Sequence, residues 1–480
     1  MKLLVNFWLT IYTDFPIKNG NPGVNYVDSL NNGGMDVFVS KFNPTTGNLI
    51  WSTYYGGMGY QTFYDLAADS QNNLYIVGNS DINTPLVSQA NSYNSNSGSG
   101  LILKFNSNDS LVWATLFGNN FDVETRDIVT DNNNDVFITG CTKNNGIPIV
   151  SFVGGYIDST YNGTNEEDAF IASFNSNDSL IWSTYYGGND YDKGTSLTVD
   201  NIGNLYVTGI TFSNNFPVYD MGGNSFIDST YSLNNSYSTS DLFVLKFYKC
   251  VRKWATLYGD TLFETTWDIT SDTDNKIYIT GAAGNLFPLC NLTYGYNQTS
   301  NTFDDAFILS FSQNDSLIWS TYLGGSSTDC GYGITTFQNK KLYVTGASWS
   351  TNTSFLYDLN PGVSWWQPTN YGSSDGFISR FSLIPILPVG VEDNIQPNNN
   401  LSIYPNPTTD DLSIVFETKD NEDIRISISN VLGQIVYNEK MEAYNGTNIR
   451  KINIAKYATG VYIVNVSTKD RNISRKIIKK

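Results

Sequence analysis

The chain has 480 residues, of which 40% are hydrophobic, and its 27 basic and 45 acidic residues give a formal net charge of −18. So acidic a chain repels phosphate backbones, which argues against a nucleic-acid partner. It contains no histidine, which excludes Ser-His-Asp and Cys-His nucleophile systems and metal sites built on imidazole, whereas carboxylate-pair catalysis and oxygen-ligand Ca²⁺ sites stay open.

The first residues, MKLLVNFWLTIY, imitate a signal peptide but lack a small-residue cleavage site. No stretch of about 18 apolar residues occurs anywhere, so no membrane-spanning helix is predicted. Because a secreted protein needs an export signal, we expect the chain to be a fragment with a signal peptide and more repeats upstream. The alternative is a ring that closes with one piece from each end of the chain.

A block that recurs five times dominates the next part of the chain. It is marked by Trp51, Trp113, Trp182, Trp254 and Trp319, at intervals of 62 to 72 residues. Each copy holds four short apolar segments separated by turns rich in Asn, Asp and Gly, which tolerate left-handed backbone. Four antiparallel strands per repeat predict an all-β fold, a β-propeller, with a solenoid as the alternative.

The repeats predict five complete four-stranded blades plus a partial sixth. The complete copies lie near residues 36–85, 99–148, 168–217, 241–288 and 305–346. Thr10 and Phe15-Pro16 match the spacing of Thr211 and Phe216-Pro217, so residues 2–16 are expected to share the partial blade with residues 375–381. The propeller is therefore predicted over residues 1–381.

Alternating strand direction predicts that the tight turns lie on one face of the propeller. The loops between the second and third strands, with the long connectors, then lie on the other face, where a ligand would be met. Aromatic side chains beside carboxylates suit sugars or peptides, although each such loop alone could simply be solvated. The candidate ligand-binding residues are Tyr60, Phe121, Asp122, Asp190, Tyr191, Asp192, Glu264 and Asp329.

Other candidate chemistry is weak. The repeated Trp-Ser-Thr rows could be a sugar platform but are better explained as blade-to-blade packing. Asp272-Thr-Asp274 resembles the start of a calcium loop without its Gly and distal Glu, so a hairpin turn is favoured, no metal site or cofactor is predicted, and Ca²⁺ is only left open. Cys141, Cys250, Cys290 and Cys330 form no CxxC pair, and spacing selects no disulfide.

The repeat resembles a known family. Trp182-Ser-Thr-Tyr-Tyr-Gly-Gly188, with Tyr-Val-Thr-Gly and Phe-Pro further on, is similar to the bacterial β-propeller repeat often called seven-bladed. The resemblance covers about residues 10–381 and implies a fold rather than an activity, because its motifs are structural.

Proline-rich residues 382–400 are predicted to be a linker before a second domain at 401–480. Residues 1–400 hold 15 basic and 36 acidic residues, whereas residues 401–480 hold 12 and 9, so the net charge changes from −21 to +3. The last 80 residues alternate apolar and polar side chains, which predicts a small antiparallel sandwich of about seven strands.

This tail resembles the type A C-terminal sorting domain of the type IX secretion system. The residues that carry the resemblance include Tyr404, Pro405, Asn406, Pro407, Gly433, Gly460, Lys476 and Lys479. The resemblance implies export across the outer membrane of a Gram-negative cell and a tail that the secretion machinery recognises. It also implies that the tail is usually removed and often exchanged for a surface glycolipid anchor.

Asp-Ser-Leu recurs at one hairpin and resembles the acceptor motif for O-glycosylation in bacteria with type IX export. Ser110, Ser179 and Ser316 would be the acceptors, although descent of the repeat alone explains the recurrence. The functional expectation is a secreted or surface-displayed, non-catalytic propeller that binds an extracellular glycan or protein. The alternatives are a carboxylate-dependent glycosidase or lyase, and a structural spacer of a larger protein.

Overall fold

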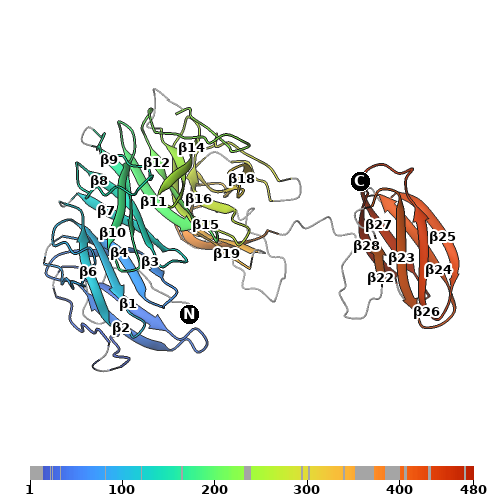
Figure 1. Cartoon of the computed structure of the whole chain (residues 1–480), viewed down its shortest axis with the longest axis horizontal. Helices are drawn as coiled ribbons and strands as arrows, with labels where there is room; N and C mark the ends of the chain where they lie inside the picture. Colours follow the sequence, from blue (N-terminus) through green and yellow to red (C-terminus); the bar gives the residue numbers. More distant parts are fainter. Residues whose placement is uncertain are drawn as a thin grey trace. The chain divides into compact units, whose positions relative to one another are not determined.

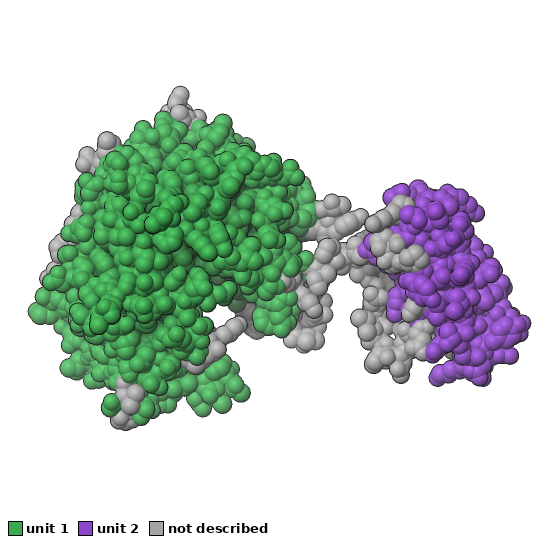
Figure 2. All heavy atoms as spheres, viewed as in Figure 1, with its two compact units in different colours: residues 1–385 green, residues 386–480 purple. Residues whose placement is uncertain are grey.

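The computed structural model divides the chain into two compact units, residues 1–385 and 386–480, which Figure 2 distinguishes by colour. It describes residues 15–479 apart from residues 22, 24, 33, 82, 120–121, 164–165, 232–238, 293–295, 301–302, 339–340, 352–371, 384–400, 405–407, 431–433 and 470–471. The predicted linker, 382–400, lies almost wholly outside the described residues.

The described part of the larger unit consists of antiparallel sheets that follow one another in chain order (Figure 1), as expected for a propeller. The first complete sheet holds β3 (Gln61–Ala68), β4 (Leu74–Ser80), β5 (Gly100–Phe105) and β6 (Leu111–Phe117). The second holds β7 (Val123–Thr130), β8 (Val136–Lys143), β9 (Glu167–Phe174) and β10 (Leu180–Tyr186). The third holds β11 (Asp192–Val199), β12 (Asn204–Thr211), β13 (Asp241–Tyr248) and β14 (Val251–Tyr258). The fourth holds β15 (Glu264–Ser271), β16 (Ile277–Ala283), β17 (Asp305–Phe311) and β18 (Leu317–Leu323). Smaller sheets hold β1 (Val37–Phe42) with β2 (Leu49–Tyr55), and β19 (Asp329–Phe337) with β20 (Lys341–Ser348) and β21 (Asp375–Ser382).

The expected blade boundaries need correction, because each sheet straddles two repeats. It takes the third and fourth strands of one copy and the first and second strands of the next. The long connector therefore lies inside a sheet, and the short Gly-containing loop before each third strand crosses to the next sheet. The described residues form four complete blades rather than five, and the all-β propeller class is confirmed.

The expected partial sixth blade is also resolved differently. Residues 375–381 belong to β21, which pairs with β20 along its whole length. Residues 2–14 lie outside the described residues, and Lys18 forms a bridge with Ser52 at the edge of β2. The connectors of later copies form the same bridge, for example Val150 with Ser183, so the matched Phe-Pro spacing places this segment beside an outer strand.

The tight turns form as the sequence predicts. In the third-to-fourth turn of the first copy, Oδ1 of Asp69 accepts the backbone N–H groups of Gln71 at 2.9 Å and Asn73 at 2.8 Å. Oδ1 of Asp272 accepts those of Asp274 and Lys276 in the same way, so the calcium-like motif is part of a hairpin turn, as favoured. An Asx turn of this kind offers the backbone a local partner where the strand ends.

The repeated tryptophans join neighbouring sheets. Trp113 is fully buried and packs edge-on against Phe174 of the next sheet, with ring centroids 5.8 Å apart. The hydrophobic core is accordingly divided among successive sheet interfaces, and one such cluster extends from Tyr75 of β4 to Tyr185 of β10. This confirms blade-to-blade packing as the role of the aromatic rows. The four cysteines are all free.

The smaller unit is the predicted seven-stranded sandwich. One sheet holds β22 (Leu401–Tyr404), β23 (Asp411–Thr418) and β26 (Gly446–Asn453). The other holds β25 (Ile435–Ala443), β24 (Glu422–Asn430), β27 (Gly460–Ser467) and β28 (Asn472–Lys479). Alternate residues, such as Ile424, Ile426 and Ile428 of β24, are fully buried between the two sheets.

Candidate functional site

Five strands form the inner side of the propeller unit. β3, β7, β11, β15 and β19 each contact the next one in the series, and we call them the inner strands. Their first and third residues are buried, whereas the second and fourth are more exposed. We call the side on which the second and fourth side chains lie the inner face.

Each inner strand carries a β-bulge at its fourth residue, where the register with its neighbour shifts. A bulge re-aims a side chain, and the same bulge on five strands gathers five side chains on the inner face. These are Tyr64, Arg126, Thr195, Trp267 and Tyr332. Trp267 and Tyr332 are each 47% exposed and meet edge to face, with ring centroids 5.4 Å apart.

A charged network surrounds Tyr64 of β3 and Arg126 of β7, which occupy the same bulge position in their strands as Trp267 and Tyr332. The Arg126 guanidinium lies 4.4 Å from the centre of the Tyr64 ring and forms an ion pair with Glu124. Lys193 of β11 adds a second ion pair to Glu124, at 3.1 Å. Burial raises the pKa of Glu124, but Lys193 and Arg126 together outweigh it, so its pKa is lowered and it stays ionised.

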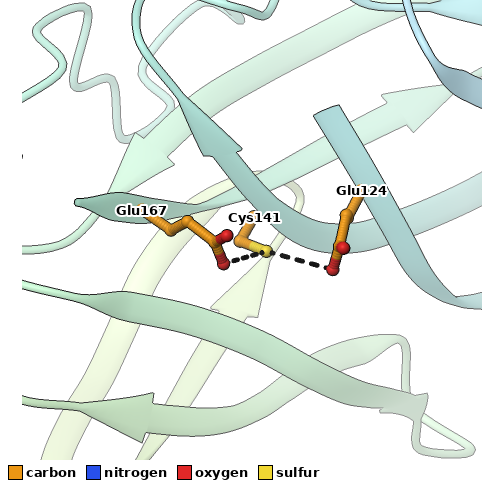
Figure 3. A group of neighbouring side chains, drawn as sticks. All are labelled: Glu124, Cys141 and Glu167. Carbon is orange, nitrogen blue, oxygen red and sulfur yellow. Dashed lines mark hydrogen bonds between the residues drawn. The ribbon is translucent and has the colours of Figure 1, made fainter. Parts of the chain in front are cut away.

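The same carboxylate lies near a thiol (Figure 3). Sγ of Cys141 donates to Oε2 of Glu167 at 2.9 Å and lies 3.7 Å from Oε2 of Glu124. Burial, opposed by Lys193 and reinforced by Glu167, raises the pKa of Cys141 well above its usual range, so the group is a thiol. Lys193 and Arg126 form ion pairs with Glu124, and Nζ of Lys143 lies 3.7 Å from Glu167, so the geometry describes a thiol–carboxylate hydrogen bond beside two paired carboxylates.

Aromatic side chains extend this network along the loop side. Tyr191 interacts with Glu167, packs edge-on against Phe212 at 5.6 Å, and Phe212 in turn lies 6.3 Å from Phe263. Phe263 is 42% exposed. We call the whole set the inner belt. Its members are Tyr64, Glu124, Arg126, Cys141, Glu167, Tyr191, Lys193, Phe212, Phe263, Trp267 and Tyr332.

Three aspartates follow the bulges directly. Oδ2 of Asp127 accepts the backbone N–H of Leu197 at 2.7 Å, and Oδ2 of Asp268 accepts that of Ile334 at 2.7 Å. Oδ2 of Asp65 accepts the backbone N–H of Ile128 at 3.4 Å. Burial, with a smaller contribution from the Asp127 carboxylate, raises the pKa of Asp268 to about 7. Each of these bonds joins one inner strand to the next.

The predicted ligand-binding residues fall into three groups. Tyr60, Asp122 and Asp190 are exposed on the loop side, and Tyr191 belongs to the inner belt. Phe121 lies outside the described residues. Asp192, Glu264 and Asp329 begin inner strands but have no exposed surface, so they cannot touch a ligand at the loop surface. The sequence analysis did not predict Glu124, Arg126 or Trp267 as site residues. The signal that could have found them is the Asp followed by an aliphatic residue that recurs in the third strand of several copies, directly after the bulge position.

The proposed acceptor serines and sorting residues are placed as follows. Ser179 and Ser316 are half-buried and donate to the backbone carbonyls of Asn91 and Asn224, and Ser110 is also half-buried. Tyr404 is exposed at the end of β22. Gly460 begins β27, Lys476 is exposed on β28 and Lys479 is buried, whereas Pro405, Asn406, Pro407 and Gly433 lie outside the described residues.

Comparison with known proteins identifies both parts of the chain. A β-propeller repeat model matches residues 50–84, 112–148 and 181–217, and a secretion system C-terminal sorting domain model matches residues 402–480. An uncharacterized WD repeat-containing protein of Acanthamoeba polyphaga mimivirus is 23% identical over 277 residues. That match covers 53% of this chain, and the chain spans 20% of that protein's length.

Solved structures with similar folds are more distant. A gluconolactonase from Xanthomonas campestris is 10% identical with a TM-score of 0.31, and the match covers 65% of this chain and 79% of that one. A xylan beta-1,4-xylosidase from Bacillus halodurans is 10% identical with a TM-score of 0.28, covering 88% and 90%. Likenesses at this level say nothing about activity. Within the described residues, the structure contains no helix able to cross a membrane. The chain therefore combines repeats of the β-propeller repeat family with a C-terminal sorting domain of the type IX secretion system, which marks it for export to the cell surface or the medium.

Proposed function

We propose that the propeller is a non-catalytic module that binds an extracellular glycan through the inner belt. The observation that carries this proposal is the exposed Trp267–Tyr332 pair on neighbouring inner strands. Leaving two large aromatic faces nearly half in water is costly unless a ligand covers them, and aromatic faces stack on the apolar faces of sugar rings. The ionised groups of Glu124 and Arg126 would supply polar contacts beside that platform.

The proposal is tested by titrating the full chain with soluble glycan oligomers, among them xylan, cellulose and chitin fragments, while tryptophan fluorescence is recorded. Binding should change the signal, and Trp267→Ala or Tyr332→Ala should weaken affinity at least about tenfold, the loss of one buried aromatic contact. Tyr248→Ala is the matched control, because Tyr248 is 39% exposed at the opposite, tight-turn end of β13. Equal affinity in all four proteins would contradict the proposal.

A carboxylate-dependent glycosidase or lyase is the second candidate, because three aspartates converge behind the bulges. Asp268, with a pKa near 7, would suit a general acid, and Asp127 lies close enough to raise that pKa. Their bonds to the backbone of Leu197 and Ile334 favour a structural role instead. Release of reducing ends from a bound glycan, abolished by Asp268→Asn while binding persists, would support the enzyme.

A further inference from the structure

Buried carboxylates meet in pairs at the sheet boundaries on the loop side. Asp168 of β9 and Asp192, the first residue of β11, have no exposed surface. Oδ2 of Asp168 accepts the backbone N–H of Asn162 at 2.8 Å, and Oδ2 of Asp192 accepts that of Gly188 at 2.6 Å and the Ser213 hydroxyl at 2.8 Å. The Oδ1 atoms of Asp168 and Asp192 are buried and accept no hydrogen bond.

The arrangement recurs in the next two copies. Asp241 faces Glu264, and both carboxylates surround Gly259: a Cβ there would lie 2.7 Å from Oδ1 of Asp241 and 2.8 Å from Oε2 of Glu264. Only glycine leaves this space open. In the following copy Asp305 lies against Gly324, where a Cβ would clash with its Oδ1, and Asp329 binds the next residue, Gly325. Oδ2 of Asp329 accepts a backbone N–H and a serine hydroxyl as Asp192 does, from Gly325 at 2.7 Å and Ser350 at 2.8 Å.

Four of these carboxylates each have one buried oxygen that accepts no hydrogen bond. Oε1 of Glu264 and Oδ1 of Asp329 are buried without a hydrogen bond, like the Oδ1 atoms of Asp168 and Asp192. Among the ion pairs that the described residues form, none involves Asp168, Asp192, Glu264 or Asp329. Two neighbouring carboxyl groups in an interior either share a proton, so that only one is ionised, or bind a cation that lets both be ionised.

We propose that these three pairs are Ca²⁺ sites, each joining the third strand of one sheet to the first strand of the next. Hard oxygen ligands are those that Ca²⁺ prefers, and one divalent ion neutralises two carboxylates. The ion would link consecutive sheets through the carboxylate oxygens that accept no hydrogen bond, which include Oδ1 of Asp168 and Asp192 and Oε1 of Glu264. The site differs from the inner belt, because its residues are wholly buried.

The first two copies provide natural comparisons. In the first copy an amide replaces the second acid, so that Gln61 lies opposite Asp36 around Gly56. In the second copy neither acid is present, and the Ser99 hydroxyl instead bonds the backbone of Val123 at 2.6 Å. Three Ca²⁺ sites are therefore expected in the chain rather than five.

The test uses the full chain stripped with a chelator and titrated calorimetrically with CaCl₂ at about pH 8, where an ordinary carboxyl is ionised. The wild type should bind three ions and unfold at a higher temperature in millimolar Ca²⁺. Asp192→Asn should lose one ion, whereas Asp190→Asn, an exposed carboxylate in the same loop, should keep all three. If Ca²⁺ neither binds nor changes the unfolding temperature, the proposal is overturned and a shared proton joins each pair.

A second variant keeps the proposal testable if Asp192→Asn does not fold. Gln61→Glu installs the missing acid opposite Asp36, so the variant should bind one ion more than the wild type. An unchanged stoichiometry in a folded Gln61→Glu protein would contradict the assignment of these pairs as cation sites. Glycan binding plays no part in either measurement, so the outcome is independent of the function proposed above.

Discussion

The indole Nε1 of Trp182 donates a hydrogen bond of 2.8 Å to the backbone carbonyl oxygen of Tyr156, a residue of the long connector within the same sheet. The tryptophans of the other four copies do the same. Their acceptors are the carbonyls of Tyr26, Tyr93, Phe226 and Tyr296, at 2.8–2.9 Å. The next residue, Ser183, donates to the carbonyl of Pro148, and Ser52 and Ser320 bond Pro16 and Pro288 in the same way. In these three copies the Trp-Ser motif and the connector proline together hold the long connector against its outer strand, whereas Ala114 and Ala255 follow the tryptophan in the other two copies.

Removing the indole N–H should therefore destabilise the propeller. Trp182→Phe leaves the Tyr156 carbonyl without its donor and loses buried volume, and we expect the free energy of unfolding to fall by about 2–4 kcal/mol. Urea denaturation followed by circular dichroism measures this. Trp267→Phe is the control, since Trp267 is half-exposed, and it should change stability by no more than about 0.5 kcal/mol. Equal effects would contradict the role given to Trp182.

A buried ion pair joins two sheets on the tight-turn side. Nζ of Lys104 lies 2.7 Å from Oδ2 of Asp178, both side chains are nearly inaccessible, and the Tyr75 hydroxyl donates to the same carboxylate at 2.9 Å. Lys104→Met leaves the Asp178 carboxylate buried without its ion-pair partner, and we expect the free energy of unfolding to fall by about 3–5 kcal/mol. Adding Asp178→Asn should recover part of it. Lys276→Met, which breaks an exposed pair with Asp274, should cost less than about 1 kcal/mol.

The repeat made much of the fold predictable. The number of strands per copy, the Asn/Asp turns, the side on which the loops lie and the seven-stranded tail all follow from local patterns. The division into sheets did not, because strand three can follow strand two in the same sheet or begin the next sheet, and strand four can end a sheet or pair, across the long connector, with the next strand one as well as with strand three. Local sequence does not distinguish these pairings. Equivalent residues such as Asp241 and Asp305 lie one repeat apart in both arrangements, so the repeat spacing does not distinguish them.

The inner belt was harder to predict for the same reason. Arg126 and Tyr64 meet because bulges at equivalent places re-aim side chains from successive strands, and Glu124 and Lys193 meet because the inner strands that carry them lie side by side. A bulge leaves no mark in hydrophobic alternation that a single sequence reveals. The sequence predicts Asp192 and Glu264 as ligand-binding residues, but their burial depends on how neighbouring sheets pack, which no local pattern records.

Stability should depend on pH through Asp268. Its pKa is about 7 in the folded protein, because burial and the nearby Asp127 carboxylate raise it by more than the backbone N–H groups of Ile334 and Ile269 and the Ser196 hydroxyl lower it. The unfolded chain releases this proton near pH 4. The folded state thus holds more protons between about pH 4 and 7, so stability falls as pH rises through that window, by an amount on the order of 4 kcal/mol.

Asp268→Asn should flatten this pH dependence, because the amide cannot titrate. The unfolding temperature measured at about pH 5 and pH 8 gives the comparison, since these values bracket the raised pKa. The exposed Asp190 provides the control variant Asp190→Asn, which should retain the wild-type difference between the two pH values. A wild type that becomes more stable across this range, or an Asp268→Asn protein with an unchanged slope, would show that Asp268 does not dominate the titration.

The thiol of Cys141 should be slow to react until its acceptor is removed. It is 1% exposed, donates to Glu167 and has a raised pKa, and only the thiolate is a nucleophile. Glu167→Gln removes a negative charge beside the sulfur while Lys193 stays, so the pKa should fall and alkylation by iodoacetamide should quicken. Mass spectrometry of the Cys141 peptide after timed labelling measures the rate. Cys250 is the internal control, because burial raises its pKa to about 12 with Asp135, not Glu167, as the nearby charge. A Cys250 rate that rises equally would indicate general loosening, and an unchanged Cys141 rate would contradict the role of Glu167.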